Sequence, residues 1–253
     1  MFNAPLRATP HGLFQTCLGV LLGSLVLAAV VTAQAPVIGN VVMFEDFEGA
    51  APGALPDGWK VSRVSASPDF PHVVSAPAGI QPRSGGKVLM VNRTVGENLS
   101  TSLSYVDFGP VEDRVVVSFW VYVTSHVRSL NVSLRGTTPD EKDTLFRPNS
   151  DSSLFLTLNT SRPDVNIRSF NRGGGWTDGP VLTRNTWHKV TLDINVRANT
   201  FDVYLNDSAT QLKDVPFVNA TRALTGLSFG YQSVTGQENE PGPVYIDDLA
   251  ISY

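Results

Sequence analysis

The sequence predicts an all-β protein, folded as a two-sheet antiparallel jelly-roll sandwich. Residues 115–123 are valines, aromatic residues and one serine, without Gly, Pro or acids, which is typical of a strand. About a dozen such short segments alternate with turn-forming clusters, for example Ser84-Gly85-Gly86. We find no stretch with apolar residues at helical spacing. Many short strands with regular turns favour a sandwich or a barrel over a sheet of alternating strands and helices.

The central strand is expected at residues 115–123, and it has one purely apolar face. Its odd-numbered positions are all Val or Phe, and successive side chains of a strand point to opposite faces. The even-numbered positions include Trp120 and Tyr122. We therefore expect the odd face in the core. The even face is either the floor of a binding groove or the contact surface of a second packed sheet.

The other strands are expected from the same pattern. They are residues 41–47, 59–64, 87–91, 101–106, 130–135, 154–158, 165–170, 187–196, 201–205, 227–231 and 244–252. The polar turn at 195–199 joins two of them into an antiparallel hairpin. Trp59 and Trp187 stand at strand starts, where we expect them to anchor the core.

The first 33 residues are predicted to be a secretory signal peptide. Arg7 precedes an apolar run at 18–31, and small residues follow this run, which is the layout of such signals. The run is shorter than the ~20 apolar residues of a membrane anchor. We favour cleavage after Ala33. Cleavage after Ala35 would make Pro36 the first mature residue, and the locked ring of a proline fits a protease site poorly. We thus predict a single sandwich domain at 34–253, secreted to the extracellular space or the periplasm, with no membrane anchor.

Composition restricts the function classes. The one cysteine, Cys17, lies in the predicted signal, so the mature chain must be stabilised by apolar burial instead of disulfides. The formal net charge is −4 and neither sign forms a long run, which gives no support for nucleic-acid binding. Asn-x-Ser/Thr sequons are glycan acceptors if the host glycosylates, or chance matches in a chain rich in these residues. They lie at Asn92, Asn98, Asn131, Asn159, Asn206 and Asn219.

Three parts of the chain resemble a known family. They are the opening at 44–49 with 56–59, the hairpin strands at 187–192 and 202–206, and the closing strand at 244–249. They are similar to the concanavalin A-like, laminin-G-like jelly rolls of exported bacterial proteins. The opening and the ending are also similar to those of carbohydrate-binding modules. The resemblance implies a partner that is a glycan or polysaccharide, or a polysaccharide-degrading enzyme on the same sandwich. A structural or adhesive exported domain is the third alternative.

The enzyme alternative can be compared with the residues. Laminarinase-type glycosidases on this fold carry two glutamates and an aspartate at alternating positions of one strand, so that the carboxyl groups share a groove. Here Asp46 and Glu48 share a face, whereas Glu45 points to the opposite one. Jelly-roll polysaccharide lyases carry a Gln-x-His strand, which this sequence lacks. His126 follows the central strand and is either a base or a histidine of a solvent-facing loop. We therefore name no catalytic residue.

A structural calcium ion (Ca²⁺) is predicted at Glu48 and Asp247. The first and last strands of a jelly roll commonly lie side by side, and acids on both repel each other unless a cation neutralises them. In the carbohydrate-binding modules that the chain resembles, calcium is held by a glutamate after a phenylalanine of the opening strand and by an aspartate of a closing Asp-Asp pair. The resemblance implies Glu48 and Asp247. Alternatively, Asp247 and Asp248 accept backbone or arginine hydrogen bonds at a strand bulge.

The candidates for a glycan site lie on the strand faces that point away from the core. They are aromatic rings, amides and guanidinium groups. Sugar rings stack on aromatic side chains, and sugar hydroxyls bond to planar polar groups. Trp176 follows three glycines, so we expect either an exposed ring on an adaptable loop or a ring that tucks this loop over the sandwich edge. The predicted ligand-binding residues are Trp120, Tyr122, Arg135, Arg168, Trp176 and Tyr204, and Asn131 is a further amide candidate.

Overall fold

The structure is a computed structural model, and it describes ten segments of the chain. These are residues 35–36, 39–63, 71–91, 101–124, 129–140, 153–159, 165–170, 175–208, 210–232 and 242–253. The predicted signal peptide and its cleavage site lie outside them. Within these segments, nothing forms a helix that could span a bilayer. The described residues form fifteen strands.

Eight of the strands form one antiparallel sheet, the eight-stranded sheet. Its order is β13-β12-β11-β6-β15-β4-β3, with β1 paired to β15. The strands are β1 (Val41–Glu45), β3 (His72–Ser75), β4 (Lys87–Val91), β6 (Arg114–Val123), β11 (Trp187–Asn195), β12 (Thr200–Leu205), β13 (Thr210–Pro216) and β15 (Val244–Ser252).

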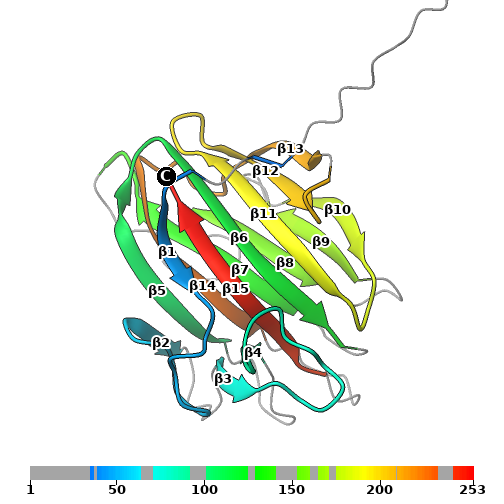
Figure 1. The fold of residues 1–253 in the computed structure, drawn as a ribbon. Helices are drawn as coiled ribbons and strands as arrows, with labels where there is room; N and C mark the ends of the chain where they lie inside the picture. Colours follow the sequence, from blue (N-terminus) through cyan, green and yellow to red (C-terminus); the bar gives the residue numbers. More distant parts are fainter. Residues whose placement is uncertain are drawn as a thin grey trace, which may run out of the picture. The chain divides into compact units, whose positions relative to one another are not determined.

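The other seven strands form a second antiparallel sheet, the seven-stranded sheet. Its order is β10-β9-β8-β7-β14-β5-β2. The strands are β2 (Trp59–Arg63), β5 (Thr101–Val111), β7 (Ser129–Thr137), β8 (Leu154–Asn159), β9 (Val165–Phe170), β10 (Trp176–Leu182) and β14 (Ala223–Gln232). Figure 1 shows β15, β6 and β11 in the layer in front of β14, β7 and β8. The predicted all-β, two-sheet sandwich is confirmed.

The core lies between the sheets and is built from alternate side chains. In β6 the odd positions from Val115 to Val123 are at most 2% exposed, as the sequence predicts. Phe119 of β6 meets Phe229 of β14 edge-to-face, with ring centroids 5.2 Å apart. Trp59 stacks on the same Phe229 at 6.3 Å, so its predicted place in the core is confirmed. These rings remove a large apolar area from water and join the two layers.

The first and last strands of the described chain pair, as expected for a jelly roll. Phe44 of β1 lies opposite Ala250 of β15. A bulge in β15 after Asp247, with Asp248 at a φ of 45°, interrupts its pairing with β6. Before the bulge β15 pairs with β4, and after it with β1 (Figure 1). The bulge thus places the carboxyl groups of 247 and 248 where three strands meet.

Each of the twelve predicted strands is found, and three strands were missed. The predicted antiparallel hairpin of β11 and β12 is confirmed, and its register places Leu192 opposite Val203. The missed strands are β3, β10 and β13. In β10 the sequence Gly179-Pro180 looks like a turn, but a bulge between Asp178 and Val181 accommodates it. Because β10 is an edge strand, the proline can lack an N–H donor without breaking a ladder.

Candidate functional site

The six predicted ligand-binding residues lie on the outer faces of two different sheets. On the eight-stranded sheet are Trp120, Tyr122 and Tyr204, and on the seven-stranded sheet are Arg135, Arg168 and Trp176. The core separates these two faces. One ligand therefore cannot contact both groups.

On the eight-stranded sheet the predicted rings are largely covered. Tyr204 is 7% exposed. The guanidinium of Arg83 lies over the ring of Trp120, 4.0 Å from its centroid. Tyr122 packs edge-on against Trp187 at 5.4 Å. The rings here stack mainly on the protein's own groups.

Trp187 was expected in the core, and this expectation was wrong. It lies opposite Tyr122 in the register of β11 and β6, and so belongs to the outer face. Its indole Nε1 donates a hydrogen bond to the carbonyl of Gln81 at 2.7 Å. A strand-initial position says little about which face a ring takes, because a shift of one residue reverses the face.

Glu48, one of the two predicted calcium ligands, holds the backbone at residues 86 and 87. Its Oε1 accepts the N–H groups of Gly86 and Lys87, at 2.8 and 2.6 Å. The Lys87 ammonium donates in turn to the carbonyls of Glu48 and Ala50, at 2.7 and 2.8 Å. The Lys87 ammonium thus already contacts the carbonyl oxygens beside the Glu48 carboxylate, a predicted calcium ligand.

Asp247, the second predicted ligand, is fully buried and holds the preceding part of the same loop. Its Oδ2 accepts the N–H groups of Arg83 and Ser84, at 2.7 and 3.2 Å. Its Oδ1 accepts the N–H of Asp248 at 2.9 Å. Burial raises the pKa of Asp247 to about 6, although these N–H donors oppose the shift.

The two carboxylates thus act on one segment, residues 83–87, through backbone N–H donors. Oε1 of Glu48 and both carboxylate oxygens of Asp247 already accept hydrogen bonds, which is the arrangement of the alternative interpretation of Asp247. Among the described residues, no three His, Cys, Asp or Glu side chains are grouped to hold a metal ion. In this arrangement the donor set does not fit a hard cation, which takes six to eight oxygen ligands. Calcium stays a prediction.

We call the hydrogen bonds from Glu48 and Asp247 to the backbone of residues 83–87 the carboxylate clamp. Gly85 lies within this segment, and Gly86 provides a matched control for testing the clamp. Gly85 has a φ of +47°, and an added Cβ would lie 2.2 Å from Cδ of Glu48, whereas a Cβ on Gly86 would meet open space. We expect Gly85→Ala to lower the free energy of unfolding by about 1–3 kcal/mol, from backbone strain and displaced Glu48 hydrogen bonds. Gly86→Ala should change it by less than about 0.5 kcal/mol. Urea denaturation of both variants measures this, and equal effects would contradict the clamp.

The acids of the opening segment serve the turn that follows β1. Oε1 of Glu45 accepts the N–H of Phe47 at 2.7 Å, and Oδ1 of Asp46 accepts the N–H of Glu48 at 3.0 Å. Burial raises the pKa of Glu45. Phe47 has a φ of 63°, which fits a tight turn held by side chains. These hydrogen bonds give the acids structural roles.

A hollow with a volume of about 250 Å³ lies at one end of β11 and β12. Its lining includes the acids Asp113, Asp193, Asp202 and Asp214. Arg114 binds Asp193 through two hydrogen bonds of 2.7 and 2.8 Å. Oδ1 of Asp202 accepts the N–H of Asp214 at 2.7 Å. Several of its polar groups therefore bind each other or the adjacent backbone.

The outer face of the seven-stranded sheet carries polar side chains on neighbouring strands, and we call it the polar face. Its members are Lys60, Tyr105, Asp107, Asn131, Arg135, Thr157, Asn166, Arg168, Trp176 and Asp178. On β14 the residues of this face with described burial are Gly226, Ser228 and Gly230, all of them small. Small residues there leave the backbone of an interior strand uncovered by large side chains of its own.

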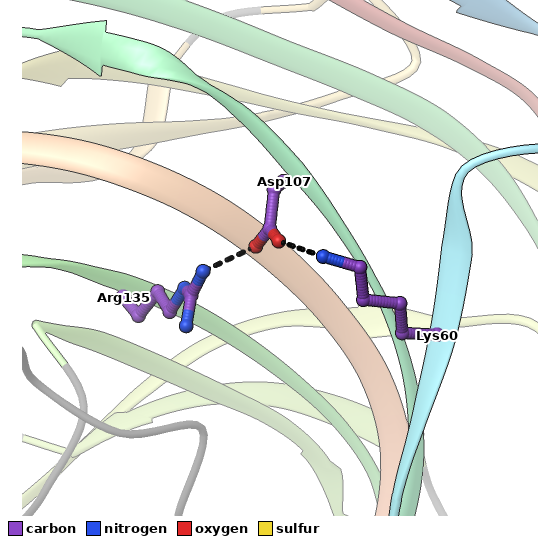
Figure 2. A network of polar contacts seen from close by, with 3 residues as sticks. All are labelled: Lys60, Asp107 and Arg135. Carbon is purple, nitrogen blue, oxygen red and sulfur yellow. Dashed lines mark hydrogen bonds and ion pairs between the residues drawn. The ribbon is translucent and has the colours of Figure 1, made fainter.

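One half of the polar face is a three-residue ionic network, shown in Figure 2. Asp107 of β5 binds Lys60 of β2 at 2.8 Å and Arg135 of β7 at 2.5 Å. The hydrogen bond to Asp107 raises the pKa of Lys60. Both cations lie near the ring of Tyr105, at 5.9 and 5.7 Å from its centroid. The Asp107 carboxylate thus bridges two cations from neighbouring strands.

The other half lies on β9 and β10 at the sheet edge. Nε of Arg168 donates to Asp178 at 2.5 Å, and its guanidinium lies 5.0 Å from the ring centroid of Trp176. Trp176 is 38% exposed and packs edge-on against Phe170 at 5.1 Å. Trp176 was expected on a loop, but it begins β10 and lies opposite Phe170. A strand therefore fixes its ring beside Arg168.

Between the two halves lie buried polar groups without partners. Asn131 and Thr157 are each 6% exposed and Asn166 is 8% exposed. The atoms Nδ2 of Asn131, Oγ1 of Thr157 and Oδ1 of Asn166 make no hydrogen bond in the part of the chain that the structure describes. Leaving such an atom unpaired costs about 1–3 kcal/mol, so a bound water or ligand group is expected there. The burial of Asn131 also argues against its sequon as a glycan acceptor in the folded protein.

Register brings these groups into one row. Asn131 of β7 lies opposite Thr157 of β8, and Thr157 lies opposite Arg168 of β9. Asp178 of β10 extends the row beyond Arg168. Sequence reasoning named Asn131 and Arg168 but missed Thr157 and Asn166. The period of two in β8 and β9 could have found both, because it places them on the face of Arg168.

Comparisons with known proteins bear on the fold. No protein-family model matches the sequence, and no curated protein matches it. Lectin II from Ulex europaeus has a TM-score of 0.50 and 10% identity, over 84% of this chain and 99% of the lectin. The chain has a concanavalin A-like fold. The predicted resemblance is confirmed at this level.

Other solved structures are similar to this concanavalin A-like sandwich with lower scores. The basic winged bean lectin, solved with the Tn-antigen, has a TM-score of 0.47 and 13% identity, over 78% of this chain and 92% of the lectin. A sialidase has a TM-score of 0.49 and 11% identity over 77% of this chain, which spans only 17% of the sialidase. The identities are too low to carry a site across.

Proposed function

We propose that the protein is a secreted, lectin-like carbohydrate-binding domain that holds a glycan or polysaccharide on the polar face. The row of buried, unpartnered polar atoms at Asn131, Thr157 and Asn166 is the observation that carries this proposal. A sugar presents several hydroxyl groups at short spacing, each of which can both donate and accept a hydrogen bond. Such a ligand would satisfy an amide N–H, a hydroxyl and an amide oxygen together.

The flanking groups support the same ligand class. The half-exposed ring of Trp176 offers an apolar surface for the C–H face of a sugar, and Tyr105 offers a second ring on the opposite half of the face. Arg135 and Arg168 add planar guanidinium groups. Three of the six predicted ligand-binding residues therefore belong to this proposal. Trp120, Tyr122 and Tyr204 lie on the opposite side of the core and stay separate predictions.

The enzyme alternative has less support than binding. His126, the one candidate base, lies outside the described residues. Glu45, Asp46 and Glu48 are engaged with the backbone around β1 and β4 instead of converging on the polar face. Product analysis after incubation with each bound polysaccharide distinguishes the two functions, since a binding domain leaves the chain length of the polysaccharide unchanged.

Two threonines on different sheets, with similar surroundings, provide a test of the proposal. Thr157 on the polar face and Thr191 on the outer face of the eight-stranded sheet are both buried, and both have an unpartnered hydroxyl. Replacement by valine removes the hydroxyl and keeps the shape. We expect Thr157→Val to weaken binding of the best ligand from a glycan array about tenfold, the effect of one lost hydrogen bond. Thr191→Val should leave binding unchanged.

Stability provides the internal control, because both variants remove a buried polar atom that makes no hydrogen bond. Neither should lower the free energy of unfolding, so weaker binding by Thr157→Val could not come from misfolding. Isothermal titration calorimetry measures the affinities, and thermal denaturation measures the stabilities. Silence of the whole array would overturn the proposed function. Weaker binding by Thr191→Val alone would move the site to the eight-stranded sheet.

A further inference from the structure

The hydrogen-bonding groups in the middle of the polar face are mostly donors. Asn131 has an unpartnered Nδ2, which carries two N–H groups, and Thr157 has an unpartnered hydroxyl. Arg168 makes one described hydrogen bond, through Nε to Asp178, so its two terminal nitrogens are not engaged in any described hydrogen bond. Within the described part of this face, Oδ1 of Asn166 is an unpartnered acceptor, and the Thr157 hydroxyl can accept as well as donate. A ligand that fits this set must be rich in acceptors.

The charges of the face favour a negative ligand. Its described members include three cations, Lys60, Arg135 and Arg168, and two carboxylates, Asp107 and Asp178. Among these described residues the cations outnumber the carboxylates by one, although the whole chain has a net charge of −4. Charge of opposite sign to the rest of the molecule, concentrated on one face, is the arrangement that attracts and orients an anion.

The geometry of Arg168 suits an oxyanion. Its side chain is 22% exposed, and both Asp178 and the ring of Trp176 hold the guanidinium. A guanidinium fixed in this way binds a carboxylate or a sulfate through two parallel N–H bonds. Thr157 lies opposite Arg168 on the adjacent strand, at a spacing of about 4.8 Å, so one oxyanion can reach both side chains. Burial around Thr157 strengthens such a charge-assisted bond.

We propose that the ligand is an acidic saccharide whose oxyanion, a uronate carboxylate or a sulfate ester, is bound by the Arg168 guanidinium and the Thr157 hydroxyl. The Asn131 amide then donates to an oxygen of the same sugar residue or its neighbour. This inference rests on the proposed function, and it specifies the ligand class for the same face.

The experiment compares acidic probes with neutral probes of the same shape. Uronate trisaccharides, namely oligogalacturonate and the oligomers of mannuronate and guluronate, are titrated beside their methyl esters, which lack the charge. A sulfated disaccharide of chondroitin sulfate and its desulfated form make up the second pair. We expect the acid of at least one pair to bind about ten to a hundred times more tightly than its neutral partner, the effect of one charge-assisted interaction.

Two arginine variants locate the effect. Arg168→Gln should remove the preference for the acid, because it weakens binding of the acid more than binding of the neutral partner. Arg114→Gln is the matched control, because Arg114 also pairs with a single aspartate, Asp193, but on the eight-stranded sheet. It should keep the full preference. Thermal denaturation of both variants shows that they remain folded.

The outcomes separate this inference from the proposed function. Equal binding of acid and neutral partner, or an acid preference that survives Arg168→Gln, would overturn the acidic ligand and leave glycan binding intact. Binding of neutral glycans only would do the same. Silence of every probe, acidic and neutral, would overturn both. Which pair shows the preference tells whether the oxyanion is a carboxylate or a sulfate.

Discussion

Replacing Phe229 by alanine will lower the free energy of unfolding by about 3–5 kcal/mol, the usual cost of deleting a buried aromatic ring. Phe229 is fully buried at the centre of the sandwich. Its ring contacts Phe119 of the opposite sheet at 5.2 Å and stacks on Trp59 at 6.3 Å. The truncation removes contacts to both sheets at once, and strands that are held in two ladders cannot collapse to fill the space.

Phe44 provides the control for this prediction. It is the same residue type in a strand, but 58% of it is exposed on β1. Phe44→Ala should change the free energy of unfolding by no more than about 0.5 kcal/mol. Urea denaturation of both variants gives the comparison. Similar losses in the two variants would mean that the two sheets are not packed through Phe229.

Stability should fall as the pH rises from about 4 to 6, through the titration of Asp247. The pKa of this buried carboxyl is raised from 3.8 to about 6. Between these two values the folded protein binds the proton and the unfolded chain does not, so acid favours the folded state. Above pH 6 this stabilisation is lost. A shift of this size corresponds to a contribution on the order of 2 to 3 kcal/mol.

Asp247→Asn isolates this contribution from the other titrating groups. An amide keeps an oxygen that can accept the N–H of Arg83 and cannot become charged. We expect the variant to gain stability relative to the natural protein as the pH rises from 4 to 7. The free energy of unfolding is measured for both proteins at each pH. Parallel pH profiles would show that Asp247 titrates as an ordinary surface carboxyl.

The fold could be predicted because its main signal is local. Alternation in residues 115–123 identifies a half-buried strand, and its odd positions are the buried ones. The same period gave the hairpin of β11 and β12. Strand β10 was missed because Gly179-Pro180 is a turn signal in isolation, and the sheet edge that tolerates it is a property of the whole sheet.

The site was predictable only in part. Alternation shows which side chains point away from the core, but it does not show to which of the two sheets their strand belongs. Trp120 and Arg168 both point outward, yet from opposite sheets. Thr157 was missed since a threonine on a wet face looks like a solvated residue in sequence. Its burial without a partner appears only when β7, β8 and β9 are placed side by side.

The acids at the chain ends show the same limit. Sequence placed Glu48 and Asp247 on neighbouring segments correctly, but it could not show which groups neutralise them. The structure supplies backbone N–H donors from residues 83–87, which lie far from both acids in the chain. The contact depends on backbone N–H groups of this segment, which every sequence carries and no side-chain pattern reveals.

A crystal structure of the protein with the acidic trisaccharide that binds best tests the proposed site most directly. We expect the saccharide on the outer face of the seven-stranded sheet, with its oxyanion against Arg168 and Thr157. A saccharide over Trp120 and Tyr122, on the outer face of the eight-stranded sheet, would contradict it.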